Sequence, residues 1–318
     1  MLHRLTIALI LVCTGLSTLQ AQQLPTLPQY REHVTLINPA AVLTDHFIFG
    51  YPTSLGISYQ QQWINVPQPP STYLIRADHY TAKRNGLSFG GHMLKDEIGP
   101  TQYLRVHGRI SGRVGWLNTK ETQLTSISAG INFGALQYHI DGSKISFLEP
   151  GDFLEDASEN LWLPDVGFGL FAYRKWKRSK DILYAGFSVP QVFNFKQRFQ
   201  NSDNQLLIER NPHYYGLAGY LHVLDAFSYI ESSIWARYIR GIWHLDANIK
   251  WQIDHLLWFG AGIDSTKNAL IEVGYIIDGR KPDARYIWKV SYGVRFNSAI
   301  AAIQLGTSHE VVLILLRK

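Results

Sequence analysis

Between Trp243 and Ile253 the chain alternates strictly between apolar and polar side chains. One side of this stretch carries Trp243, Leu245, Ala247, Ile249, Trp251 and Ile253, and the other carries His244, Asp246, Asn248, Lys250 and Gln252. Side chains of a β-strand point alternately to opposite faces, whereas a helix would distribute these residues around its circumference. The pattern therefore predicts an extended strand with one apolar face and one polar face.

This predicted strand has the length and the aromatic boundaries of a strand that crosses a membrane. Trp243 and Trp251 lie eight residues apart, which is about 26 Å at roughly 3.3 Å per residue. A tilt of roughly 40° reduces this span to about 20 Å, near the ~25 Å apolar band of outer-membrane barrels, which aromatic girdles flank. Strands of soluble sandwiches are usually shorter, at about 5–6 residues. We therefore favour an outer-membrane barrel strand.

The same alternation recurs along the chain. Between Leu104 and Val114 the apolar positions are interleaved with a basic row, made of Arg105, His107, Arg109 and Arg113. Arginine that faces lipid at mid-bilayer costs roughly 2–4 kcal/mol, so the row is predicted to line the barrel lumen and to meet water or acidic partners there. The predicted strands are 54–63, 71–80, 86–94, 102–114, 124–137, 165–173, 181–189, 213–223, 229–239, 242–253, 256–263, 268–277, 285–297 and 307–316.

The number of strands and the lengths of the gaps agree with a closed barrel. An even number of strands is the rule for single-chain bacterial barrels, whose periplasmic turns are short and whose extracellular loops are longer. The two longest gaps, 138–164 and 190–212, both fall on the side predicted to be extracellular. The sequence thus predicts an all-β fold, a transmembrane antiparallel β-barrel of about 14 strands.

The first residues have the features of an export signal. His3 and Arg4 give a basic start, residues 5–12 are an apolar core, and Ala21 is a small residue suited to a cleavage site. We expect residues 1–21 to be a signal peptide that is removed after Ala21. After it, no run approaches the ~18–20 apolar residues of a transmembrane helix.

Between the expected signal peptide and the barrel at 54–318 lies a proline-containing segment, residues 22–53. Proline removes a backbone donor and discourages regular structure, so this segment is predicted to be a short periplasmic or plug segment. Its prolines are Pro25, Pro28, Pro39 and Pro52.

Composition limits the classes of function. The single cysteine, Cys13, lies in the expected signal peptide, so the mature chain would have neither disulfides nor thiolate metal sites. Lipidation of Cys13 is disfavoured because Val12 is not a small residue. The chain has 30 Lys and Arg; without Arg4, 29 remain against 25 Asp and Glu, too weak a balance to indicate nucleic acid. Aromatic residues make up 13% of the chain and favour the membrane barrel.

Several segments along the mature chain, taken together, resemble one family. They are Gln29-Tyr30 with Asn38-Pro39-Ala40, Tyr59 to Trp63 with Pro70 and Thr72, Gly86 to Gly90 with Asp96 to Thr101, Gly167 to Leu170 with Gly186 to Pro190, and Ser308-His309-Glu310. In this order they resemble the PorP/SprF family of outer-membrane barrels attached to the type IX secretion system of Bacteroidetes. One departure is the end of the chain, where Lys318 stands in place of the aromatic residue common in barrel proteins.

The resemblance implies a location in the outer membrane and a non-enzymatic role. Family members hold or help export type IX secretion substrates at the cell surface, and in gliding relatives the cargo is a large adhesin. The implied partners are a secreted cargo protein with a C-terminal sorting domain, type IX components or periplasmic lipoproteins, and outer-membrane lipid. The alternative is a passive or anion-preferring channel. No catalytic residue, cofactor or metal site is predicted.

Candidate partner contacts follow from the resembling segments. Asp96, Gly99 and Pro100 fall in a predicted extracellular gap and are either a contact for cargo or a lipoprotein, or an ordinary turn. His309 and Glu310 are adjacent strand residues that point to opposite faces, so they are not expected to act together on one substrate. The remaining candidates, in the segment before the barrel, are Asn38 and Pro39.

A basic run lies in a gap predicted to be periplasmic. Two readings remain open for it: a contact for an acidic periplasmic partner or phosphate headgroups, or simply a soluble turn. The run comprises Arg174, Lys175, Lys177, Arg178 and Lys180.

Overall fold

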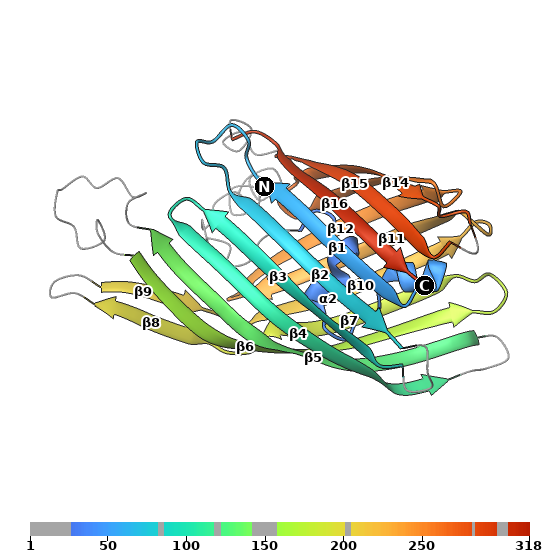
Figure 1. Cartoon of the computed structure of the whole chain (residues 1–318), viewed down its shortest axis with the longest axis horizontal. Helices are drawn as coiled ribbons and strands as arrows, with labels where there is room; N and C mark the ends of the chain where they lie inside the picture. The colour runs from blue at the N-terminus through green and yellow to red at the C-terminus, as the bar shows by residue number, and fades with distance from the viewer. Residues whose placement is uncertain are drawn as a thin grey trace, which may run out of the picture.

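Fourteen antiparallel strands close into a barrel in the computed structural model of the chain (Figure 1). The structure describes residues 27–81, 86–117, 122–141, 158–200, 205–281, 284–297 and 305–318. Neighbours along the chain are neighbours in the wall, except that β7 pairs with β10, and the barrel closes by pairing of the first strand, β1, with the last, β16. The prediction of an antiparallel barrel of about 14 strands is confirmed.

The wall strands coincide with the predicted ones in number and order. They are β1 (Thr53–Gln61), β2 (Ser71–Tyr80), β3 (Ser88–Ile98), β4 (Thr101–Leu117), β5 (Thr122–Asp141), β6 (Ser158–Trp176), β7 (Ile182–Gln191), β10 (His213–Val223), β11 (Tyr229–Ile239), β12 (Ile242–Ile253), β13 (Leu257–Asp264), β14 (Ala269–Ile277), β15 (Tyr286–Phe296) and β16 (Ser308–Arg317). A separate hairpin, β8 (Phe195–Gln200) and β9 (Gln205–Arg210), follows β7.

Apolar side chains face outward and polar ones inward, the reverse of a soluble protein. On β14, Ile271 is 58% exposed whereas its neighbour Glu272 is 3% exposed. Trp243 and Trp251 are both on the outside of β12, with exposed fractions of 65% and 49%. This arrangement suits a wall whose outer surface contacts lipid tails.

The neighbouring strands β4, β5 and β6 are longer than the sequence predicts. Residues 158–164, predicted to be part of a loop, belong to β6, and β5 continues to Asp141. Here the outward positions become polar, as in Gln137, whose side chain donates a hydrogen bond to Asn160 at 3.1 Å. Leu161 and Leu163 face inward and Trp162 faces outward, so the alternation of polar inward and apolar outward residues that predicts a strand in a membrane is lost. The β8–β9 hairpin, in the gap predicted as a loop, was missed as well.

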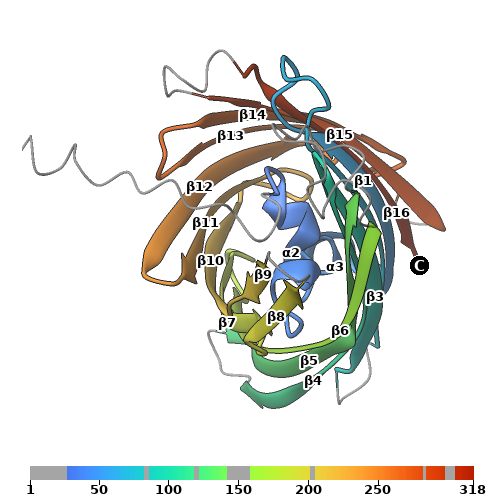
Figure 2. The ribbon, with the colours of Figure 1, turned by 90° about the vertical axis from the view of Figure 1, so that its left-hand side faces the viewer.

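The segment before the barrel forms short helical turns inside the ring of strands (Figure 2). These are η1 (Tyr30–His33), α2 (Val34–Ile37) and α3 (Thr44–Phe49). The prolines were expected to discourage regular structure, but Pro39 falls between α2 and α3 and therefore interrupts neither. Among the described residues, no helix is long and apolar enough to span a membrane.

The assignment of the outward face to lipid can be tested by single substitutions to arginine at two depths. Ile131 is on the outside of β5 near its middle and Ile277 is at the end of β14. We expect Ile131→Arg to lower the free energy of unfolding in phospholipid vesicles by roughly 2–4 kcal/mol, and Ile277→Arg by about 0–1 kcal/mol, because the cost depends on depth. Urea titration measures both; equal losses would contradict the assigned depth.

Candidate functional site

The lumen of the barrel is occupied by residues 27–50, here called the plug. Tyr30, Ile37 and Ala40 of the plug are almost fully buried. They share one apolar core with inward side chains of the wall, among them Leu74, Leu94, Leu136 and Trp235. The inner face of the wall is therefore partly apolar, and these positions are buried by the plug.

A ladder of buried ion pairs joins the plug to strands β12, β14 and β15. Lys250 donates to Glu32 at 2.9 Å, and Lys289 donates to both Glu32 at 2.7 Å and Asp45 at 2.8 Å. Arg31 of the plug pairs with Glu272. Burial opposes ionisation of Glu32, but the two lysines outweigh it and hold the pKa of this carboxyl well below its usual range.

Asn38 and Pro39 lie against a patch of glycines on the wall. The Asn38 side chain donates to the carbonyl of Leu170 at 2.9 Å and accepts from the backbone N–H of Ala40 at 2.9 Å. A Cβ at Gly169 would overlap Asn38 Oδ1, and one at Gly130 would lie 2.5 Å from the Pro39 oxygen. Glycine at these two positions thus makes room for the plug.

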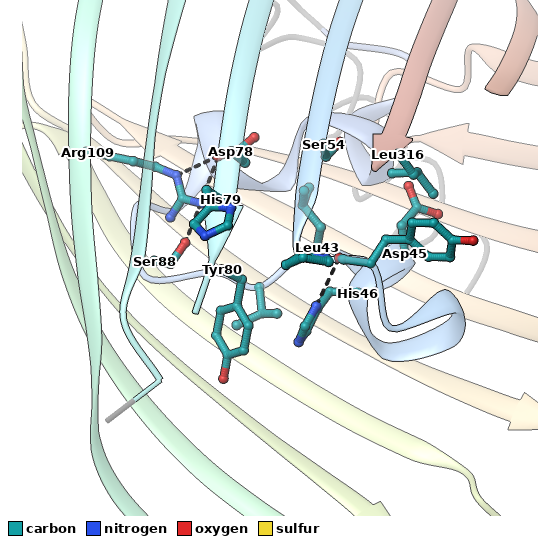
Figure 3. A pocket seen from close by; sticks show the side chains of 13 residues that line it. Leu43, Asp45, His46, Ser54, Asp78, His79, Tyr80, Ser88, Arg109 and Leu316 are labelled. Carbon is teal, nitrogen blue, oxygen red and sulfur yellow. Dashed lines mark hydrogen bonds and ion pairs between the residues drawn. The ribbon is translucent and has the colours of Figure 1, made fainter. Parts of the chain in front are cut away.

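Arg109 connects the plug to the wall beside this patch. Its guanidinium donates to the Pro39 carbonyl at 3.0 Å. It also donates to Asp78 at 2.7 Å and to Ser88 at 2.8 Å (Figure 3). Asp78 also accepts from Thr35 of the plug at 3.2 Å. The residues in Figure 3 line a small cleft of about 20 Å³ between α3 and the wall.

The other residues of the basic row also face the lumen. Arg105 and His107 converge on the fully buried Asp165, at 3.7 and 3.0 Å, and Arg210 donates to the same carboxylate at 2.7 Å. Arg113 donates to the hydroxyl of Tyr80 at 2.7 Å. The charges of Arg105 and Arg109, and the imidazole of His107, are thus directed at carboxylates that sequence analysis did not single out.

Asp78 and Asp165 could have been found from strand alternation alone. Asp78, like Arg76, is at an inward position of β2. Asp165 is at an inward position of β6, between residues that face outward and are apolar. An isolated carboxylate at an inward position in a lipid-facing strand needs a cation, and the basic row supplies it. Which cation pairs with which carboxylate depends on strand register, which the sequence does not give.

Glu310 ties the last strand to the start of the plug. It accepts from the backbone N–H of Gln29 at 2.9 Å, and its other oxygen lies 3.0 Å from His33 Nε2. Its neighbour His309 is on the outer side, hydrogen-bonded to Tyr292 at 2.5 Å. The two residues therefore serve opposite faces of the wall.

The remaining candidates lie near one rim of the barrel. Asp96 is a buried inward residue of β3 that accepts from Thr72 at 2.5 Å. Gly99 and Pro100 form the turn between β3 and β4, where Gly99 has a φ of 56°, a conformation that favours glycine. The seven candidate contacts are thus divided among the lumen, the rim and the outer wall, and do not form a single surface.

One group of potential metal ligands appears that the sequence alone did not indicate. His244, Asp246 and Asp264 place one ligand atom each within 4.8 Å of one another. However, Arg237 already donates to Asp246 at 2.7 Å, and Arg295 donates to both aspartates, at 3.2 and 3.5 Å. These guanidinium groups neutralise the carboxylates, so the group is better described as part of the lumen's charge network.

Removal of one lysine should loosen the plug. Lys289→Met leaves Asp45 without this cation and Glu32 with one of its two lysines, so we expect the free energy of unfolding to fall by about 3–5 kcal/mol. Thermal unfolding in detergent measures it, together with protease cleavage within residues 27–50. The matched control is Lys281→Met, in an exposed pair with Asp278, which should change stability by less than about 1 kcal/mol. Equal losses of stability in the two variants would contradict the stabilising role of the buried ion pairs.

A methyl group at the glycine patch should act on the plug specifically. Gly169→Ala is expected to displace Asn38 and to expose the plug to protease while the wall remains folded. Gly216→Ala is the control, because a Cβ there meets only Ala236 at 3.7 Å, an ordinary contact. Identical proteolysis of both variants would show that Asn38 is not held against Gly169.

Comparison with solved structures identifies similar barrels. A deletion mutant of the monoaromatic hydrocarbon channel TodX matches with a TM-score of 0.52 at 9% identity, over 88% of this chain and 92% of that chain. The Acinetobacter baumannii outer membrane protein Omp33 matches with a TM-score of 0.43 at 9% identity, over 84% of this chain and 98% of that chain. At such identities the likeness concerns the fold alone.

Comparison with curated protein sequences gives no match. A family model described as "Type IX secretion system membrane protein PorP/SprF" matches residues 19–315. The match spans nearly the whole chain and confirms the resemblance seen in the sequence segments. The chain belongs to the PorP/SprF family of type IX secretion system membrane proteins.

Proposed function

We propose that this protein anchors or escorts a type IX secretion substrate at the cell surface while its own lumen stays closed. The family supports a role in type IX secretion, and the barrel fold with the family supports an outer-membrane location. The proposal includes removal of residues 1–21 after Ala21, leaving residues 22–53 ahead of the barrel. The cargo is a secreted protein with a C-terminal sorting domain, such as a surface adhesin.

The observation that carries this proposal is the buried attachment of the plug. A passive pore needs a continuous aqueous path, whereas here Glu32, Asp45 and Asn38 fix the plug to opposite parts of the wall. Releasing it would leave Lys250, Lys289 and Glu272 without these partners. A barrel whose lumen is filled by the plug is suited to binding a partner at its surface rather than to passing solutes through its lumen.

The proposed cargo surface is the end of the barrel opposite the C-terminus. There β5 and β6 run to Asp141 and from Ser158, and the β8–β9 hairpin projects beyond the wall (Figure 1). The turn at Gly99 and Pro100 lies at the same end, because β3 and β5 run in the same direction. Longer extracellular connections of this kind are usual in outer-membrane barrels.

An anion-preferring channel is the alternative. The basic row favours anions only if its charges face open water, yet Arg105 and Arg109 lie against Asp165 and Asp78. The barrel fold and the family favour secretion or transport over catalysis. We accordingly propose no enzymatic activity, and no cofactor.

The proposal is tested by isolating a tagged copy from its native outer membrane in mild detergent and identifying its companions by mass spectrometry. A large exported protein with a C-terminal sorting domain, recovered in a constant ratio, supports anchoring. Deletion of the barrel should also remove that protein from the cell surface. A solitary barrel, recovered while the cargo is present in the cell, contradicts the proposal.

Conductance measurements distinguish a plugged anchor barrel from an open channel. In planar bilayers the wild-type barrel should be electrically silent, because the plug blocks the lumen. Gly169→Leu should produce discrete openings, since the larger side chain displaces Asn38 from the wall. Steady, anion-selective current through the wild type would instead favour the channel.

A further inference from the structure

Aromatic and basic side chains gather on the outer surface where β6 ends. The Arg174 guanidinium lies 5.1 Å from the ring centroid of Trp176, and Trp176 meets Tyr220 of β10 edge to face, with ring centroids 6.5 Å apart. Three further basic residues of the following turn are exposed. We call Arg174, Lys177, Arg178 and Lys180 the basic cluster.

The basic cluster is at the end of the barrel that is periplasmic in this family of folds. β6 ends at Trp176 and β16 ends at Arg317, and both run in the same direction around the antiparallel wall. The short turns and the chain end mark this side, whereas the long connections are at the other side. The cluster thus lies level with the headgroups of the periplasmic leaflet.

An apolar groove begins beside the basic cluster on the lipid-facing surface. Its volume is about 660 Å³, and it crosses β10, β11, β12 and β13. Small outward residues, Ala218, Ser232, Ala247 and Ala261, form its floor. Larger ones border it, namely Leu183, Tyr220, Ile234, Ile249 and Ile263.

Strand register shows that the cluster and the groove are continuous. Arg174 is the cross-strand partner of Leu183, which is the partner of Tyr220, which in turn is the partner of Ser232. The same row continues to Ile249 and Ala261. Because barrel strands are tilted, a row perpendicular to them runs obliquely across the membrane. The groove therefore leads from the headgroup level into the hydrocarbon region.

We propose that this surface is a binding site for one anionic phospholipid of the periplasmic leaflet. The basic cluster binds the phosphate group and an acyl chain lies in the groove. Guanidinium groups match the geometry of phosphate oxygens, and basic pockets at a membrane surface bind anionic headgroups. A soluble acidic protein would satisfy the cluster but could not fill a groove that lies within the bilayer.

A second turn on the same side carries basic residues away from the groove. After β14, Arg280 pairs with Asp254 and Lys281 pairs with Asp278. The turn after β6 brings four basic residues together beside the apolar groove.

The headgroup contact is tested with full-length protein in nanodiscs that contain dioleoylphosphatidylglycerol and dioleoylphosphatidylethanolamine. Native mass spectrometry should show phosphatidylglycerol retained preferentially by the wild type. Lys177→Gln/Arg178→Gln should reduce its retention at least fivefold, whereas Arg280→Gln/Lys281→Gln removes equal charge elsewhere and should leave it unchanged. Equal retention by both double variants, or no preference for phosphatidylglycerol in the wild type, would overturn the proposal.

The acyl contact needs a second pair of variants. Ala247→Phe fills the floor of the groove, and Ala129→Phe makes the same change at an outward position of β5 outside it. Only Ala247→Phe should lower phosphatidylglycerol retention, with the heat-dependent gel mobility of the folded barrel preserved in both. Retention unaffected by Ala247→Phe, or displacement of the lipid by a co-purifying protein on this face, would refute the groove as an acyl site.

Discussion

Charges buried inside this barrel must be paired, and for two inward lysines of the wall the plug supplies the partners. Lys250 and Lys289 project inward from β12 and β15 and would be costly without carboxylates nearby. Glu32 and Asp45 of the plug meet them at 2.7–2.9 Å. The wall and the plug therefore depend on each other: without the plug the wall has uncompensated cations, and without the wall the short helical turns have no core.

The segments that resemble the PorP/SprF family acquire a common physical role in the structure. The stretch Asn38-Pro39-Ala40 lies against Gly169 and Gly186 of the central segments. Gln29 lies against Glu310 of the last strand. Many of the family-like segments thus form the contact between plug and wall, which joins parts of the chain that are far apart in sequence. The proposed contact with cargo would instead fall on the rim of the barrel, where the turn at Gly99 and Pro100 lies.

Sequence analysis predicted the wall strands well because lipid on one side and a polar lumen on the other impose a period of two. It lost the signal where that contrast ends, at residues 158–164 and in the β8–β9 hairpin. The helical turns of the plug were missed because four to six residues carry no amphipathic period. Of the site, the basic row was readable from sequence, whereas its pairing with Asp78 and Asp165 depends on register across the barrel.

The most direct test of the central claim is surface display of cargo by a barrel whose plug is locked. A Cβ at Gly293 would lie 3.4 Å from Gln29 Cγ, the place that a cysteine sulfur would take, so Gln29→Cys/Gly293→Cys in a Cys13→Ser background should form a disulfide in oxidised cells. The cross-strand pair Ile131→Cys/Phe168→Cys provides the control for oxidation. The account predicts a cross-linked plug with cargo display at the wild-type level. Display that is lost on oxidation and restored by dithiothreitol would contradict it, because the lumen would then have to open.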